Sequence, residues 1–143
     1  MKYKFLKQTA DVRFQAEGKT LEEAFSNSVL ALRETIAGKI NIVGKKEKKI
    51  SADGKDFESL FYNFLEEFLY LLDAEGFLAS KVKEIKIDRK NFELKAVVLG
   101  DKASHYKFSN AVKAITYNNM FVRQEKDKKT KEIKWVVQVV VDV

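Results

Sequence analysis

The clearest hydrophobic pattern in the chain lies between Asp56 and Gly76. Apolar residues recur there at steps of three and four, which places nearly all of them on one face of a helix. Asp56 can cap the first turn, and Gly76 stands where a left-handed residue commonly ends a helix. Carboxylates interrupt the stretch too often for a membrane span, so the apolar face should pack against a sheet. The apolar positions are Phe57, Leu60, Phe61, Phe64, Leu65, Phe68, Leu69, Leu71 and Leu72.

A second helix is predicted to begin after Thr20 and to stop at Gly38, because Thr20 and Glu23 form a capping-box pattern. Alternating apolar and polar positions, the period of a strand, fill much of the remaining chain. The phase of one such segment slips between Val82 and Ile85, which predicts a β-bulge. Residues 100–110 read as an irregular loop. The predicted strands are 2–7, 11–16, 48–52, 81–88, 91–99, 112–123 and 132–142.

The order of these elements is ββαβαββββ. Two helices and mostly hairpin-linked strands predict an α+β sandwich, in which a mixed or mainly antiparallel sheet packs against both helices. The 143 residues fit one domain, and no repeat or linker divides residues 1–143.

Composition and charge indicate the cellular compartment and the kind of partner to expect. The chain has no cysteine, which agrees with a reducing compartment, and its first residues lack the apolar run of a signal peptide. No membrane span is predicted, so a soluble, cytoplasmic protein is expected. The net charge of +6 fits either an acidic or nucleic-acid partner or simply a well-solvated lysine-rich surface.

Two lysine-rich segments, 45–49 and 126–134, could touch phosphate groups. Neither contains the interleaved aromatic residues that stack on bases, and such segments are often hairpin tips that protect sheet edges. His105 is the only histidine and falls in the expected loop. Because no nucleophile–base pair and no histidine-containing metal set can be assembled, the sequence favours a protein without catalytic activity.

Two carboxylates at opposite ends of the chain form the candidate site. Asp11 opens the second predicted strand and Asp142 ends the last one, each on the side away from the apolar positions of its strand. Val143 would add its terminal carboxylate. If the two strands are neighbours, these oxygen donors converge and suit a hard divalent cation such as Ca²⁺ or Mg²⁺. Ordinary solvated aspartates are the alternative.

Six phrases along the chain together resemble the archease family. They occur in that family's order and cover nearly the whole chain. The phrases are FLKQTADV from Phe5, TLEEAF from Thr20, LFYNFLEE from Leu60, LDAEG from Leu72, VKAITY from Val112 and VDV from Val141.

The resemblance implies a non-enzymatic protein that activates the RtcB-type RNA ligase of tRNA splicing. Such proteins promote guanylylation of the ligase, allow multiple turnover and broaden its nucleotide use. The resemblance also implies a divalent cation, with calcium expected and magnesium or manganese as alternatives. The metal ligands carried onto this chain are Asp11, Asp142 and Val143, and Lys113 matches a lysine tied to ligase activation.

Two positions depart from the family pattern. Gln8 and Asn118 stand where many relatives have histidine. Any contribution of those histidines to metal binding or to ligase contact is therefore lost or altered here.

Two other functions remain open from the residues alone. One is a chaperone-like interaction module that uses the exposed row of Tyr62, Asn63, Glu66 and Tyr70. The other is a basic RNA-binding domain that uses the lysine-rich hairpins, with tRNA affinity that falls steeply as salt rises.

Overall fold

The computed structural model describes residues 2–7 and 10–143, and its elements follow the predicted order. A short 3₁₀ helix, Ala103–His105, is the one addition within these residues. The helices are α1 (Leu21–Ala37) and α2 (Phe57–Glu75). The strands are β1 (Tyr3–Leu6), β2 (Val12–Gly18), β3 (Lys46–Asp53), β4 (Phe77–Asp88), β5 (Glu93–Lys102), β6 (Ala114–Lys126) and β7 (Ile133–Asp142).

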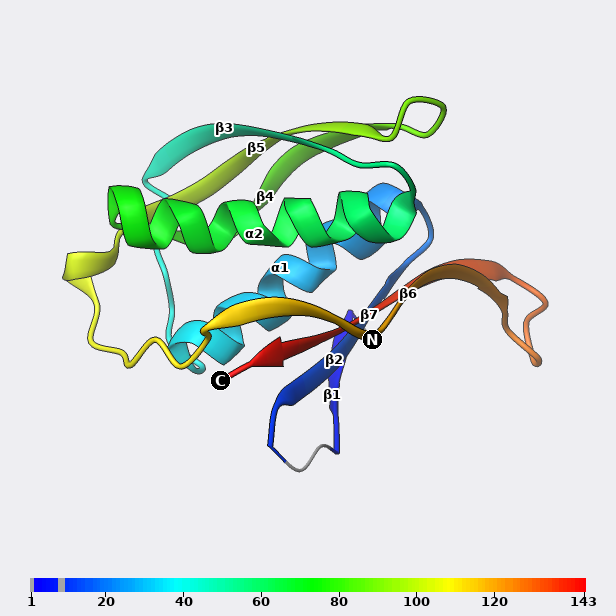
Figure 1. The fold of residues 1–143 in the computed structure, drawn as a ribbon, viewed down its shortest axis with the longest axis horizontal. Coiled ribbons are helices and arrows are strands. Elements are labelled where there is room, and N and C mark those ends of the chain that lie inside the picture. Colours follow the sequence, from blue (N-terminus) through cyan, green and yellow to red (C-terminus); the bar gives the residue numbers. More distant parts are fainter. Residues whose placement is uncertain (1, 8–9) are drawn as a thin grey trace.

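The strands form two sheets that enclose the two helices (Figure 1). One sheet has the order β1-β2-β7-β6 and the other the order β3-β5-β4, and all of these neighbours pair antiparallel. The predicted α+β class is therefore confirmed. The division of the strands into two sheets is a feature that the alternation pattern did not reveal.

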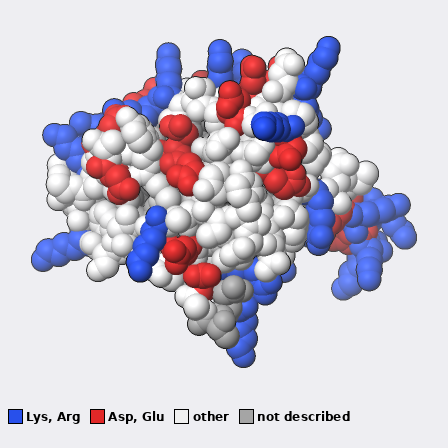
Figure 2. All heavy atoms as spheres, viewed as in Figure 1, with Lys and Arg blue, Asp and Glu red and all other residues white. Residues whose placement is uncertain are grey.

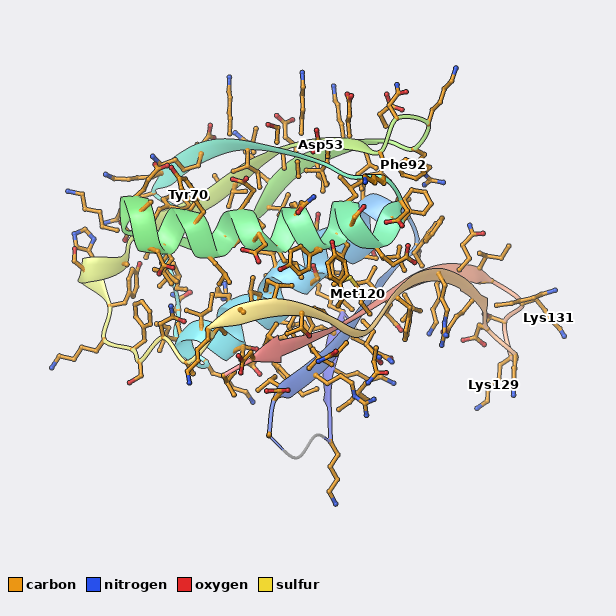
Figure 3. All side chains as sticks on the ribbon, viewed as in Figure 1. Asp53, Tyr70, Phe92, Met120, Lys129 and Lys131 are labelled. Atoms are coloured by element: carbon orange, nitrogen blue, oxygen red, sulfur yellow. The ribbon has the colours of Figure 1, made fainter. Side chains whose placement is uncertain are left out.

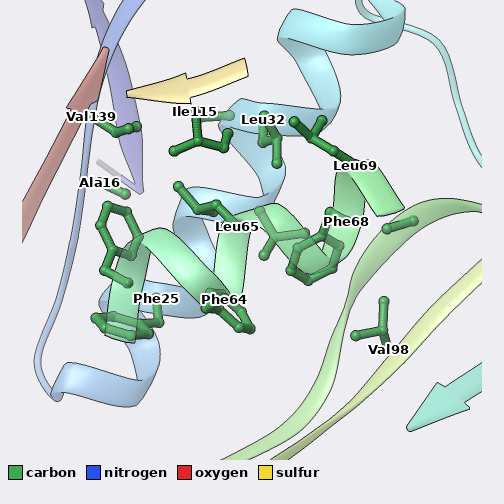
Figure 4. Close-up of a cluster of buried hydrophobic side chains, with 14 of the residues drawn as sticks. Ala16, Phe25, Leu32, Phe64, Leu65, Phe68, Leu69, Val98, Ile115 and Val139 are labelled. Carbon is green, nitrogen blue, oxygen red and sulfur yellow. The ribbon is translucent and has the colours of Figure 1, made fainter. Parts of the chain in front are cut away.

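The core lies between the sheets and is built around α2 (Figure 4). Phe64 is fully buried, and its ring lies 5.6 Å from that of Phe25 and 5.1 Å from that of Phe68. Burying each such side chain contributes about 1.5–3 kcal/mol. On the four-stranded sheet, Val137, Val139 and Val141 face this core, so β7 is fixed with its alternate residues pointing outward.

Both helices begin and end as their sequences predict. The Thr20 hydroxyl accepts a hydrogen bond from the Glu23 amide at 3.0 Å. Asp56 and Ser59 form a reciprocal capping box at the start of α2. Gly76 ends α2 in the left-handed conformation, with φ 60° and ψ 30°.

Several strand boundaries differ from the predicted ones. β2 continues to Gly18, and β4 begins at Phe77 directly after the α2 cap. The predicted bulge is confirmed, since the β4–β5 register shifts between Val82 and Glu84, and a second shift precedes it. Phe92, expected within a strand, instead lies in a left-handed turn with φ 50°, so β5 begins at Glu93, two residues later than predicted.

The loop expected at residues 100–110 begins later than predicted. β5 runs on to Lys102, because Gly100 and Asp101 still pair with β4. Asp101, which fell within the expected loop, is consequently a buried strand residue.

Candidate functional site

The candidate site lies at the edge of the sheet where β2 begins beside the end of β7. Val12 is paired with Val141 in the antiparallel register, so the next residues along the two strands are Asp11 and Asp142. Val141 is fully buried and Val12 packs against the core. Alternation turns the aspartates to the outer face of the sheet, and residues opposite each other on one face have Cβ atoms roughly 4.5–5.5 Å apart. The structure thus brings together two residues from opposite ends of the sequence.

The oxygen chemistry of this strand end fits a hard cation. Asp11 and Asp142 are half-buried, and neither side chain takes part in a hydrogen bond or ion pair within the described residues. Val143 is partly buried and packs against the core. No group of three or more His, Cys, Asp or Glu side chains gathers within residues 2–7 and 10–143. Asp11 and Asp142 are therefore the carboxylate side chains that this strand end offers to a cation.

Lys113 reaches the same strand end through its backbone. Its amide donates a hydrogen bond to the Asp142 carbonyl at 2.7 Å, and its side chain is exposed. The register partner of Asp142 is Ala114 rather than Lys113. The Lys113 backbone is thus held at the end of β7, but its side chain does not project from the position directly across from Asp142.

Gln8 and Asn118 are the two positions that depart from the family pattern. Gln8 lies outside the described residues. Asn118 is exposed in an interval of β6 where the register with β7 is interrupted, between Thr116 and Phe121. Asn119 adopts φ 54° in that interval, so the segment bends away from regular pairing.

Arg13 is a neighbour of the site that the sequence analysis missed. It is paired with Val140 and lies two residues from Asp11, which puts both on the outer face of the sheet. Its Nη2 donates to the Lys7 carbonyl at 3.3 Å, while its buried Nε has no partner among the described residues. The alternation of Asp11 and Arg13 in the sequence was the signal that could have identified it.

The single histidine takes part in a clamp away from the strand end. His105 Nδ1 lies 3.2 Å from Asp101 Oδ1, and the Tyr106 hydroxyl donates to Asp101 Oδ2 at 2.8 Å. The Val43 amide donates to the same hydroxyl at 2.9 Å. The Tyr106 hydroxyl, followed by the Lys102 amide and His105, lowers the pKa of Asp101 below its ordinary value. His105 is therefore a largely exposed partner of Asp101, and Asp101 holds the loop together.

No helix within the described part of the chain is long and apolar enough to cross a membrane. The fold and the strand-end carboxylates define a small α+β protein whose candidate site joins the two ends of its sequence.

The chain belongs to the archease protein family, whose model matches residues 3–143. It is 37% identical to an archease of Pyrobaculum neutrophilum, over 99% of this chain and 95% of the relative. It is 38% identical to an archease of Pyrococcus abyssi, over 99% of each chain. The solution structure of protein 1598 of Methanobacterium thermoautotrophicum superposes with a TM-score of 0.80 at 29% identity, covering 99% of both chains.

Proposed function

We propose that this protein is a non-enzymatic activator of an RtcB-type tRNA-splicing RNA ligase, acting on guanylylation and multiple turnover of that ligase. Membership of the archease family supports an activator of tRNA splicing. The observation that supports the finer proposal is the β2–β7 register, in which Val12, the neighbour of Asp11, pairs with Val141, the neighbour of Asp142.

Asp11, Asp142 and Val143 would hold a divalent cation, for which calcium is the first choice and magnesium or manganese the alternatives. When bound, the cation would supply a positive charge that a phosphate or carboxylate group of the ligase can approach. The Lys113 side chain would contact such a group from the neighbouring strand, since the bond between its amide and Asp142 holds it at this end. Exposure of Lys113 leaves its ammonium free to do so.

Transfer of GMP to the ligase and multiple-turnover ligation of tRNA halves, each measured with and without this protein, test the proposal. We expect Asp142→Ala to lose most of the stimulation, by about tenfold or more, because a half-buried metal ligand is removed. Asp73→Ala is the matched control, since Asp73 is an exposed carboxylate on α2. Full stimulation by Asp142→Ala would contradict the proposal.

A chaperone-like role is the second candidate, and one surface feature favours it. The Tyr62 and Tyr117 rings are stacked with centroids 4.2 Å apart, and 54% of Tyr117 is exposed. Tyr70, on the same helix as Tyr62, is 58% exposed (Figure 3). If this aromatic surface binds clients, Tyr70→Ser with Tyr117→Ser should abolish suppression of aggregation of unrelated proteins while ligase stimulation persists.

A further inference from the structure

The connection between β6 and β7 is a projecting hairpin rich in lysine. Figures 1 and 2 show it extending from the body of the molecule with basic side chains gathered at its tip. Residues 126–131 contain four lysines and one aspartate, a charge of +3, which is half of the net +6 of the whole chain. We call Lys126, Lys128, Lys129 and Lys131 the tip lysines.

The turn is ordered by the one acidic residue within it. The Asp127 carboxylate accepts hydrogen bonds from the amides of Lys129 and Thr130 at 2.8 and 3.1 Å. Main-chain bonds also join Asp127 to Lys131 and Glu132. The amides of Thr130 and Lys129 hold the pKa of Asp127 below its ordinary value. The negative charge is therefore used inside the turn, and Lys129 and Lys131 point outward (Figure 3).

Within the described residues only Lys48, Lys83 and Lys134 among the lysines form ion pairs, so the tip lysines differ from the other lysines in their crowding on one hairpin. None of the ion pairs within the described residues includes any of the four. At the base of the hairpin, Arg123 is held by Glu125 at 2.8 Å and lies 3.9 Å from the Phe121 ring centroid. The paired lysines, by contrast, are Lys48 with Glu75, Lys83 with Glu47, and Lys134 with Glu17.

We propose that this hairpin is an arm that contacts the phosphate backbone of RNA without reading its sequence. Unpaired ammonium groups on a narrow ribbon suit a line of phosphates, whose neutralisation releases counterions. The tip has no aromatic residue to stack on a base, so specificity for bases is not expected. A protein partner fits less well, because protein interfaces are depleted of lysine and need aromatic, aliphatic or arginine anchors.

The choice of RNA as the nucleic acid rests on the proposed function. An activator of a splicing ligase works beside a ligase bound to tRNA halves. An arm that touches the RNA backbone would keep this protein on the ligase–RNA complex through repeated turnovers. Its lysines are separate from Asp11, Asp142 and Lys113, so the arm and the strand-end site can be tested independently.

Fluorescence anisotropy with a labelled RNA stem-loop, measured across a salt series, tests the arm on the full chain. The variant is Lys126→Gln, Lys128→Gln and Lys129→Gln together. It leaves Lys131 unchanged, because Lys131 adopts the left-handed φ of 65°. We expect affinity to fall about tenfold or more near 100 mM salt, and the slope of log K against log salt to fall by about 2–3.

The matched control removes the same charge from the outer face of the three-stranded sheet. The control variant carries Lys49→Gln, Lys86→Gln and Lys95→Gln together. These three lysines are exposed on that face and line one shallow surface depression. We expect the control to change affinity by less than about threefold and to leave the salt slope near that of the wild type. The proposal of an RNA-binding arm would be wrong if both variants lost RNA affinity equally or if the hairpin variant kept the wild-type affinity. It would also be wrong if the wild type did not bind RNA.

Guanylylation of the ligase in the absence of RNA separates the two proposals. The hairpin variant should stimulate it as the wild type does, whereas Asp142→Ala should not. If the wild type fails to stimulate guanylylation, the proposed function fails while the anisotropy result for the arm stands. If the hairpin variant loses capture of the ligase but keeps RNA affinity, the hairpin docks a protein and the arm is wrong.

Discussion

Asp101 is a carboxylate whose surroundings fix both its position and its charge. Its side chain is only 4% exposed, yet it accepts hydrogen bonds from the Tyr106 hydroxyl and the Lys102 amide and lies beside His105. A buried carboxylate is tolerated when such donors replace water. It ties the end of β5 to the loop after it and, through the Tyr106 hydroxyl, to Val43.

The clamp predicts a stability difference that depends on pH. Because the pKa of Asp101 is lowered in the folded state, its contribution is complete above the ordinary value of 3.8 and is lost as pH falls through the folded-state pKa. Asp101→Asn should lower the urea midpoint at pH 7, and the gap from the wild type should close in acid. A gap that stays constant through pH 3 would contradict this account.

Gly76 is a residue whose backbone angles decide its identity. It adopts φ 60°, and a Cβ added there would have no atom within 4 Å. Gly76→Ala should therefore destabilise the protein by about 1–2 kcal/mol through backbone strain alone. Gly76→Asn is the control, since asparagine tolerates this conformation and should lose less. Equal losses measured by urea denaturation would show that strain is not the cause.

α2 packs between the two sheets and buries a row of large apolar side chains. It lies between β3 and β4 on one side and β6 on the other (Figure 1). Its first turn depends on Asp56, whose carboxylate accepts the Ser59 amide at 2.7 Å. The Ser59 amide and hydroxyl hold the pKa of Asp56 below its ordinary value, so this carboxylate caps the helix in its charged form near neutral pH.

Removal of this cap should be measurable in the whole protein. Asp56→Ala should cost about 0.5–2 kcal/mol of unfolding free energy at pH 7, because an amide of the first turn loses its acceptor. Asp56→Asn should retain most of that free energy, since its side-chain oxygen can accept the same bond. An alanine variant as stable as the wild type in urea denaturation would rule out the cap as a determinant of α2.

β2 and β7 are the central pair of the four-stranded sheet, and their pairing brings the first and last parts of the sequence together. If Asp11 and Asp142 bind calcium together, calcium must stabilise the folded protein, because the unfolded chain separates the two carboxylates. The wild-type melting temperature should rise by several degrees in excess calcium over the value in a chelator.

The variant Asp142→Asn should lose this rise, and Asp73→Asn should keep it. Asp73 is an exposed carboxylate of α2, so it matches the charge change without touching the strand end. A calcium-dependent rise in Asp142→Asn equal to that of the wild type would exclude the proposed ligand set.

Much of the local structure followed from the sequence, while the pairing of strands that are distant in sequence did not. The spacing of Phe57 to Leu72 predicted α2, and the capping residues predicted its ends, because these signals act over a few residues. The structures predicted for Phe92 and Asp101 were wrong because local signals do not include pairing between strands. Their local patterns read as strand and loop, whereas pairing between β4 and β5 decided otherwise.

The sequence by itself determined the two helices and the alternation that turns Asp11 and Asp142 away from the apolar positions of their strands. Only the tertiary structure decided that β2 lies next to β7, in the register that sets Asp11 beside Asp142. The hairpin between the last two strands was expected from the sequence, but only the tertiary structure decided that it extends beyond the body of the molecule (Figure 1). Alternation fixes which face a side chain takes, but a strand's partner and register depend on packing between residues that are far apart in the chain.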